Sequence, residues 1–382
     1  MKYLLFEYDQ GGPNNIITAF KYIIFLAKIT NRIIVLPKPK PIYHFDWGPA
    51  GIIEDPSQLN EDTIIEETCI TDMIDLKPFE SFVKIISFAE FVEQRSEIPN
   101  CVINYDNKLS ERIQIKPQVS RFSKTKGDHR PYYWNAYDNY LEKLIKKNKI
   151  KKDWILYCRE NFRIIPERNA QKFVDKLLQK TGPKYSFIHI PMDENYKIKK
   201  KERYPRMFDF TKNFKFEDKN QKIWSLIHKK LKYHPDFYTV VENIIFNKMN
   251  GDNYDALHWR YSGFHQKKDK TGMEILEDIK SKVKSNFLYI SSDSTNEIFS
   301  DIDQTKFHFK IISSKDFEIT DYLNNPKFLS FIELLLCVKS SIFIGTHRST
   351  FSCEILNTRK KTQYTYKNMK GFITKDNKNY LI

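Results

Sequence analysis

Residues 2–37 read KYLLFEYDQGGPNNIITAFKYIIFLAKITNRIIVLP, and this stretch decides the fold class. The apolar run 2–8 is typical of a strand, and a turn rich in glycine and asparagine, 9–15, leads into 16–30, which has the length of a helix. A run of β-branched residues follows at 33–37 and ends in proline, which predicts a second strand. Strand, helix and strand in this order form a βαβ unit, which implies a parallel sheet covered by helices.

The same alternation of strand and helix returns, more clearly, in the last third of the chain. It predicts a second doubly wound α/β domain, so we place a domain boundary near residue 240 and expect domains 1–240 and 241–382. We expect loops and short elements at 40–135 and a polar loop at 192–220. The expected strands are 185–191, 254–259, 287–291, 307–312 and 341–344; the expected helices are 136–150, 167–180, 221–250 with Pro235 as an interruption, 271–285, 295–301, 326–339 and from 351 onward.

Composition limits the class of protein. Apolar residues make up 41% of the chain and aromatic residues 15%, which excludes a disordered protein. The formal charge of +15 favours an anionic partner, such as a nucleotide diphosphate, nucleic acid or an acidic membrane surface. Five cysteines without a CxxC pair argue against a disulfide framework or a zinc module. With no signal peptide and no apolar run long enough to span a membrane, we expect a cytoplasmic protein.

Two polar clusters follow predicted strands at 254–259 and 287–291, where ligands bind open α/β sheets. In the first, Arg260 is able to form paired hydrogen bonds with a diphosphate, or alternatively an ion pair with a nearby loop. In the second, Asp293 is able to accept hydrogen bonds from a base or ribose, while Ser294 or Asp293 would also suit the N-cap of a helix.

The third cluster, residues 345–352, joins a predicted strand to a helix through glycine, hydroxyl residues and Arg348. Hydroxyls and backbone N–H groups at a helix start are typical of a phosphate site, and the cluster is longer than one helix cap requires. The paired asparagines of the N-terminal turn would hold a sugar or phosphate, or merely favour the turn. The sequence Asp301-Ile302-Asp303 matches the DxD pattern of metal-dependent transferases, but we interpret it as a surface turn and expect no metal site.

Taken together, these stretches resemble the GDP-fucose protein O-fucosyltransferase family. The turn 11–15 with the segment Ala27-Lys28-Ile29-Thr30-Asn31-Arg32 is similar to the opening of that family. Residues 257–260 resemble its H-x-R strand end, residues 289–294 its nucleotide-contacting strand end, and residues 343–351 its phosphate loop.

The resemblance implies a GT-B fold, with two Rossmann-like domains facing across a cleft: an N-terminal domain on the acceptor side and a C-terminal domain that binds the nucleotide sugar. It implies an inverting, metal-independent enzyme that moves fucose from GDP-fucose to a hydroxyl of a protein or glycan, with no cofactor beyond that donor. Arg260 would stabilise the departing GDP and Asn15 would lie near the sugar and acceptor. The expected donor-binding residues are Gly11, Gly12, Asn14, His258, Asp293, Ser294, Gly345, Arg348, Ser349, Thr350 and Phe351.

Two other functions compete with this one. The first is a transferase on the same scaffold that uses another nucleotide sugar, such as a rhamnosyl donor. The second is a basic α/β protein that binds nucleic acid without catalysis. The lysine-rich runs 146–152 and 199–203 would carry that binding, but a solvated surface explains them better, so we regard a nucleic-acid partner as the weaker alternative.

Overall fold

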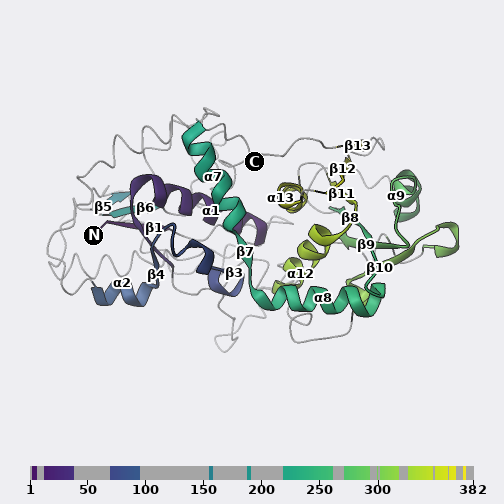
Figure 1. The fold of residues 1–382 in the computed structure, drawn as a ribbon, viewed down its shortest axis with the longest axis horizontal. Helices are drawn as coiled ribbons and strands as arrows, with labels where there is room; N and C mark the ends of the chain where they lie inside the picture. Colours follow the sequence, from purple (N-terminus) through teal and green to yellow (C-terminus); the bar gives the residue numbers. More distant parts are fainter. Residues whose placement is uncertain are drawn as a thin grey trace, which may run out of the picture. The chain divides into compact units, whose positions relative to one another are not determined.

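The computed structural model describes residues 2–6, 13–37, 69–94, 155–157, 187–190, 218–260, 271–292, 299, 302–317, 326–346, 349–359, 361–366 and 373–375 (Figure 1). Two compact units, residues 1–232 and 233–382, are defined by contacts within the chain, and each contains one main sheet. The predicted boundary near 240 and the roles given to the two domains stay predictions.

The sheet of the N-terminal unit has the strand order β4-β2-β1-β6-β5, and all its pairs are parallel. The expected βαβ unit is present: β1 and β2 pair in parallel, and the helix α1 lies between them in the sequence. The bounds are β1 Tyr3–Phe6, α1 Pro13–Thr30, β2 Ile33–Val35, η2 Ile70–Asp72, β3 Ile74–Asp75, η3 Lys77–Phe79, β4 Ile85–Ile86, α2 Phe88–Gln94, β5 Ile155–Tyr157, β6 Phe187–Ile190 and α7 Asp218–Lys230.

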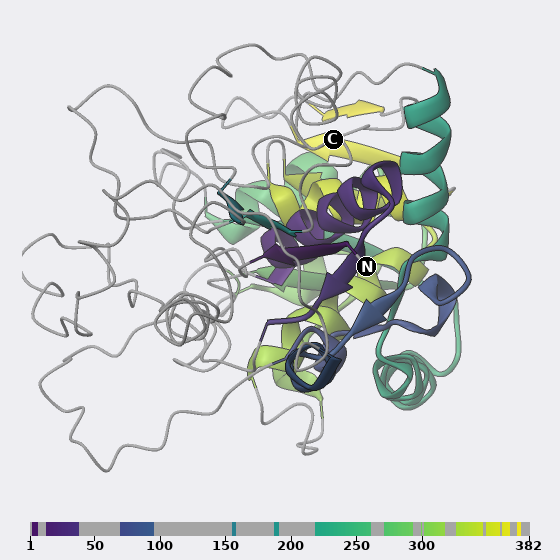
Figure 2. The same cartoon turned by 90° about the vertical axis from the view of Figure 1, so that its left-hand side faces the viewer.

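Helix α1 is buried over most of its length because apolar residues occur on nearly all its faces. The aromatic ring of Phe25 packs edge-on against that of Trp224 in α7, with ring centroids 6.0 Å apart. Both side chains are almost completely buried, and Figure 2 shows α7 beside α1. None of the helices in the described part of the chain is long and apolar enough to cross a membrane.

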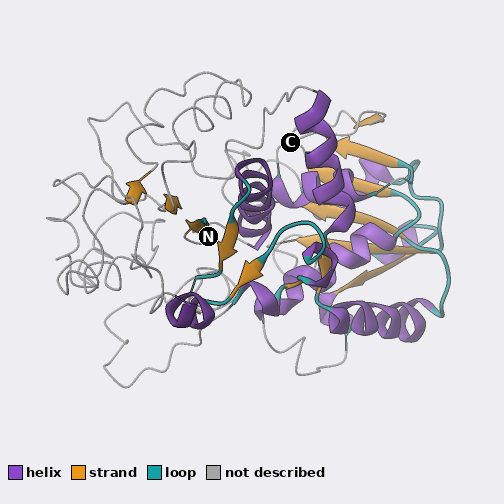
Figure 3. Ribbon diagram, turned by 60° about the vertical axis from the view of Figure 1, so that its left-hand side comes forward, coloured by secondary structure: helices purple, strands orange, loops and turns teal. Residues whose placement is uncertain are grey.

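The sheet of the C-terminal unit has the order β10-β9-β8-β11-β12-β13, and every pair is parallel except β12 with β13. Figure 3 shows its strands side by side, with helices against the sheet. The short strand β7, Lys232–Tyr233, spans the boundary between the units. The bounds within the C-terminal unit are α8 Pro235–Met249, β8 Asp255–Trp259, α9 Gly272–Ile279, β9 Phe287–Ser292, η7 Gln304–Lys306, β10 Lys310–Ser313, η8 Ser314–Asp316, α12 Pro326–Lys339, β11 Phe343–Thr346, α13 Thr350–Thr358, β12 Gln363–Tyr366 and β13 Ile373–Lys375.

Alternation along β8 gives the two faces of this sheet different neighbours. Leu257 and Trp259 belong to the apolar core that includes α9. His258 points to the opposite face, where its ring contacts α13. On this second face α12 packs against α8, with the rings of Phe237 and Phe331 stacked 5.4 Å apart. Helices therefore cover both faces, as a doubly wound domain requires.

Most of the expected elements are present, and the differences are local. The predicted helix 221–250 is interrupted before Pro235: α7 ends at Lys230, and Pro235 begins α8, because its missing N–H is not needed in the first turn. The predicted helix 271–285 ends at Ile279, and the predicted strand 307–312 is instead β10 at 310–313. Strands β3, β4, β5, β7, β12 and β13 were not among the expected strands, and β7 lies within the segment predicted to be helical. The expected helices 136–150, 167–180 and 295–301 lie outside the described residues.

Candidate active site

The C-terminal sheet has a topological switch point between β8 and β11. From β8 the chain moves outward to β9 and β10, and it then returns to the other side of β8 with β11 and β12. Two crossover connections diverge at such a point and leave a crevice at the carboxyl ends of the two strands, where open α/β sheets bind their ligands. The first and third polar clusters expected from the sequence are therefore brought together.

The backbone of Arg260 is held at this point by Thr346, the last residue of β11. The Thr346 hydroxyl donates to the carbonyl oxygen of His258 at 2.7 Å and accepts the N–H of Arg260 at 3.0 Å. Thr346 is buried, and Arg260 is half-buried. One hydroxyl thus joins the ends of both strands and fixes the backbone from which the guanidinium extends.

His258 is fixed by α13, the helix that follows β11. Its Nδ1 atom lies 2.7 Å from the Ser352 hydroxyl oxygen, and its ring packs against that of Phe351 with centroids 4.6 Å apart. His258 is buried, with 5% of its surface exposed. The expected donor-binding residues His258 and Phe351 are therefore in direct contact with each other.

Gly345 makes this contact possible. It is the partner of His258 in the register of β11 against β8. A Cβ atom on Gly345 would lie 2.8 Å from Cε1 of Phe343 and 3.0 Å from both Cβ and Oγ of Ser352. Such distances are too short for ordinary packing, so a side chain here would push α13 away from the sheet. The glycine is required by close approach rather than by its backbone angles.

Ser349 begins α13 as its N-cap. Its side-chain oxygen accepts the N–H of Ser352 at 3.4 Å, and the hydroxyl is buried. The sequence left open whether this stretch is a helix cap or a phosphate site, and the Ser349 side chain serves the cap. Thr350 and Phe351 form the first turn of the helix, where backbone N–H groups lack partners within the helix.

The end of β9 is supported by a carboxylate that the sequence analysis missed. Glu333 of α12 accepts the hydroxyl of Tyr289 at 3.2 Å and that of Ser291 at 3.1 Å. Burial, and then the nearby Glu333 carboxylate, raise the pKa of Tyr289 well above its usual value. The available signal was a single acidic residue within the apolar helix 326–339. Ser291 thus has a structural partner, and Asp293 and Ser294 lie outside the described residues.

In the N-terminal unit, α1 begins in the predicted glycine–asparagine turn. Asn14 lies in its first turn with 6% of its surface exposed, and its Oδ1 atom has no hydrogen-bond partner in the described part of the chain. Asn15 belongs to the same turn of helix, but its side chain is not described. Gly11 and Gly12, like Arg348 of the third cluster, lie outside the described residues.

The DxD sequence forms a turn at Asp303. Its Oδ1 atom accepts the backbone N–H of Thr305 at 3.1 Å and the hydroxyl of the same residue at 2.5 Å, and these bonds lower the pKa of the carboxyl. Asp303 therefore caps the short helix η7, as the surface-turn interpretation predicts. Asp301 lies outside the described residues. Within the described segments, no group of three or more His, Cys, Asp or Glu side chains is arranged to hold a metal ion.

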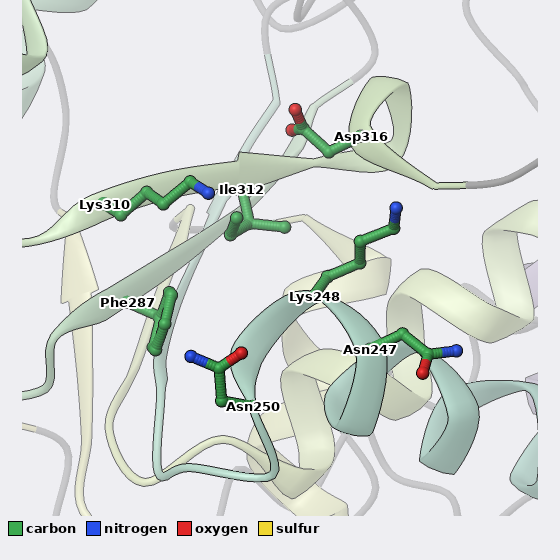
Figure 4. A pocket seen from close by; sticks show the side chains of 7 residues that line it. All are labelled: Asn247, Lys248, Asn250, Phe287, Lys310, Ile312 and Asp316. Carbon is green, nitrogen blue, oxygen red and sulfur yellow. The ribbon is translucent and has the colours of Figure 1, made fainter.

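A separate pocket of about 480 Å³ lies between the end of α8 and the edge of the sheet (Figure 4). Phe287 and Lys310, the first residues of β9 and β10, line it, so it is distinct from the switch point at the carboxyl ends of β8 and β11. The other lining residues are Asn247, Lys248, Asn250, Ile312 and Asp316.

Comparisons with known proteins were made against families, curated sequences and solved structures. The chain matches the family model described as GDP-fucose protein O-fucosyltransferase over residues 3–361. The search of curated protein sequences gave no match. POFUT1 solved in complex with GDP-fucose is similar at 13% identity and a TM-score of 0.51, covering 94% of each chain. POFUT1 in complex with GDP is 14% identical with a TM-score of 0.50, covering 93% of this chain and 94% of the other.

The fucosyltransferase NodZ from Bradyrhizobium is also similar, at 10% identity and a TM-score of 0.51, covering 98% of this chain and 99% of that one. At such identities the likeness concerns the fold, and it confirms the α/β, GT-B-type class expected from the sequence. The family match covers nearly the whole chain and includes the βαβ unit, the H-x-R strand end and the β11–α13 junction. This chain therefore belongs to the GDP-fucose protein O-fucosyltransferase family.

Proposed function

We propose that the protein is an inverting glycosyltransferase that moves fucose from GDP-fucose to a hydroxyl of a protein or glycan, without a metal ion. The observation that carries the proposal is the fixed junction at the switch point, where Thr346 joins Arg260 to β11 and Ser352 joins His258 to α13. The family match and the GDP and GDP-fucose bound to POFUT1 in its solved structures support the choice of donor.

Arg260 is the residue we assign to stabilise the leaving group. As the bond between the sugar and the β-phosphate breaks, negative charge grows on the diphosphate, and a fixed guanidinium offsets it without reorganising during the reaction. The Thr346 hydroxyl holds the Arg260 backbone, so the side chain starts from a defined point. The N–H groups at the start of α13 would add positive potential. This would stabilise a nearby negative charge by about 0.3–1 kcal/mol in exposed settings.

The N-terminal turn is proposed to hold the sugar. An acceptor oxygen that is buried without a partner, such as Oδ1 of Asn14, is satisfied when a hydroxyl donates to it. Asn15 is proposed to lie near the sugar and acceptor. Asp293 and Ser294 would contact the nucleoside, and Arg348 the phosphates. In an inverting transfer the acceptor hydroxyl attacks the anomeric carbon opposite the departing GDP.

Hydrolysis of GDP-fucose tests the proposal without knowledge of the acceptor. We expect the wild type to release GDP from GDP-fucose, and Arg260→Ala to lower kcat by about 100- to 1000-fold. Arg260→Lys keeps the charge but loses the paired geometry, and is expected to fall between the two. A thermal melt unchanged from the wild type would show that the variants are folded. Full turnover in Arg260→Ala would contradict the assigned role.

Two further measurements test the finer parts of the proposal. We expect turnover in excess EDTA to equal turnover in added Mg²⁺ or Mn²⁺, since the assigned residues stabilise the diphosphate themselves. We also expect the fucosylated product to have the anomeric configuration opposite to that of the donor, as determined by NMR. Loss of activity in EDTA with recovery on adding metal would refute metal independence, and retention of configuration would refute the single-displacement mechanism.

A further inference from the structure

We propose that Ser352 is a positioning residue that holds His258 as the neutral imidazole with its proton on Nε2. One consequence of the inference rests on the proposed function: a ring with its proton on Nε2 is able to donate a hydrogen bond to the anionic sugar nucleotide. The hydrogen bond itself, between the Ser352 hydroxyl and Nδ1 at 2.7 Å, is independent of that function.

The direction of this hydrogen bond follows from burial. Ser352 is completely buried, and within the described part of the chain the one hydrogen-bond partner of its hydroxyl is Nδ1 of His258. If Nδ1 carried a proton, the hydroxyl would accept and its own hydrogen would be buried without an acceptor. An unpaired buried donor costs about 1–3 kcal/mol, whereas an oxygen lone pair without a donor is tolerated more often. The hydroxyl therefore donates, and Nδ1 accepts.

The tautomer follows from this direction. A neutral imidazole that accepts at Nδ1 carries its proton on Nε2, which makes Nε2 a donor. The imidazolium has protons on both nitrogens, so the same serine disfavours the charged ring. A neutral ring with its proton fixed on Nε2 is able to donate one hydrogen bond to a phosphate oxygen. The positive charge at the site then comes from Arg260.

Three structural features hold Ser352 at this distance. It is the third residue of α13, where the Ser349 cap fixes its backbone N–H. Gly345 leaves the space that its side chain occupies. The Phe351 ring lies tilted by 32° against the imidazole and limits its rotation. Ser352 was part of the polar stretch seen in the sequence, but the residue acts through His258 rather than on substrate.

The direct test is NMR of protein labelled with ¹⁵N histidine, using two-bond correlations between ring nitrogens and carbon-bound protons. Ser352→Ala identifies the His258 signals among the nine histidines, because its ring signals alone are expected to shift strongly. At pH 7 we expect wild-type His258 to show an unprotonated Nδ1 and a protonated Nε2. A protonated Nδ1, either as the other tautomer or as the imidazolium, would overturn the inference.

Variants then measure the consequence for donor binding. We expect Ser352→Ala to weaken GDP binding about fivefold, because the productive form of the ring becomes one of several populated forms. Gly345→Ala should reproduce the effect, since the added methyl displaces Ser352. Thr358→Val, which removes a hydroxyl bonded to the carbonyl oxygen of Glu354 in the same helix, is the matched control and should bind GDP like the wild type. Unchanged GDP binding in Ser352→Ala would overturn the positioning role.

The two ideas fail in different ways. If wild-type protein does not bind GDP, the proposed function fails, while the NMR measurement still decides the state of His258. If GDP binds but Nδ1 is protonated, the positioning role fails and the proposed function stands. If Ser352→Ala does not fold, the histidine signal that moves most when GDP is added to the wild type identifies His258.

Discussion

At the scale of single residues, two groups of buried polar side chains in the C-terminal unit lie at opposite ends of the strands. One group lies at the carboxyl ends of the strands and holds the backbone and ring of the proposed donor site, as Thr346 and Ser352 do. The other group lies at the opposite ends and stabilises the fold, as Arg359 and Asp255 do. These four residues are alike in burial and differ in the end of the sheet at which they lie.

Arg359 gives the first stability prediction. Burial lowers the pKa of its guanidinium to about 10. The guanidinium donates to four backbone carbonyls between the end of α12 and the start of β11, to the carbonyl of Thr362 before β12, and to the Ser340 hydroxyl. Arg359→Met removes all of these hydrogen bonds at once, although the Cys337 carbonyl oxygen keeps the Ser340 hydroxyl and the Thr362 carbonyl oxygen keeps the N–H of Phe343 as donors. We expect a loss of about 3 kcal/mol or more, seen as a lower melting temperature.

Lys361→Ala is the matched control for Arg359. The Lys361 ammonium also donates to a carbonyl oxygen of α12, that of Lys339, at 3.0 Å, but this hydrogen bond is exposed to water. We expect a change within about 0.5 kcal/mol. Equal losses in the two variants would show that the buried cation is not what holds α12 to β11.

At the scale of elements, the C-terminal sheet is tied together at its amino end by Asp255, the first residue of β8. The completely buried carboxylate accepts the N–H groups of Lys284 and Ser285, before β9, and of Ile342, before β11. One side chain thus sets the start of three neighbouring strands and, through them, the register at the switch point.

Removing this carboxylate should destabilise the whole C-terminal unit. We expect Asp255→Ala to cost about 3–5 kcal/mol, because three backbone N–H groups lose their completely buried acceptor. Asp303→Ala is a suitable control, since Asp303 also accepts a backbone N–H but is exposed to solvent, and its loss should change the melting temperature far less than that of Asp255. Similar melting temperatures for the two variants would contradict the role given to Asp255.

The elements were predictable where one periodic pattern determined them. Helix α12 has the predicted bounds, 326–339, because its apolar run is long and begins at proline. Helix α9 ends at Ile279, six residues before its predicted end at 285. Lys284 and Ser285 are not helical because their N–H groups bond to Asp255, a residue distant in sequence. The two-residue strand β4 leaves too short a pattern to recognise.

The candidate site was predictable in its location but not in its contacts. Glycine and hydroxyl residues after a strand indicated the β11–α13 junction, and they correctly placed it beside the H-x-R strand end. The pairing of Ser352 with His258 depends on the register of β11 against β8 and on the absence of a Cβ at Gly345. Neither is visible in a local sequence pattern.

At the scale of the whole molecule, the net charge of +15 favours anionic ligands of any kind. Salt screens a long-range attraction of this sort and weakens it. Salt weakens the hydrogen bonds of a half-buried guanidinium much less. We therefore expect GDP affinity to fall only a few-fold between 50 and 300 mM NaCl, as measured by calorimetry. A decrease of several orders of magnitude would indicate binding by diffuse charge, as for nucleic acid.

The central claim is that the switch point of the C-terminal sheet belongs to a site for GDP-fucose. The most direct measurement is a thermal-shift comparison of GDP, GDP-fucose, GDP-mannose, UDP, UDP-glucose and a short DNA duplex, with Arg260→Ala in parallel. A ligand at 100 times its Kd stabilises the folded state by about 2.7 kcal/mol. We predict that GDP and GDP-fucose raise the melting temperature of the wild type, and raise it less in Arg260→Ala. Stabilisation by UDP instead, or by DNA alone, would contradict the claim.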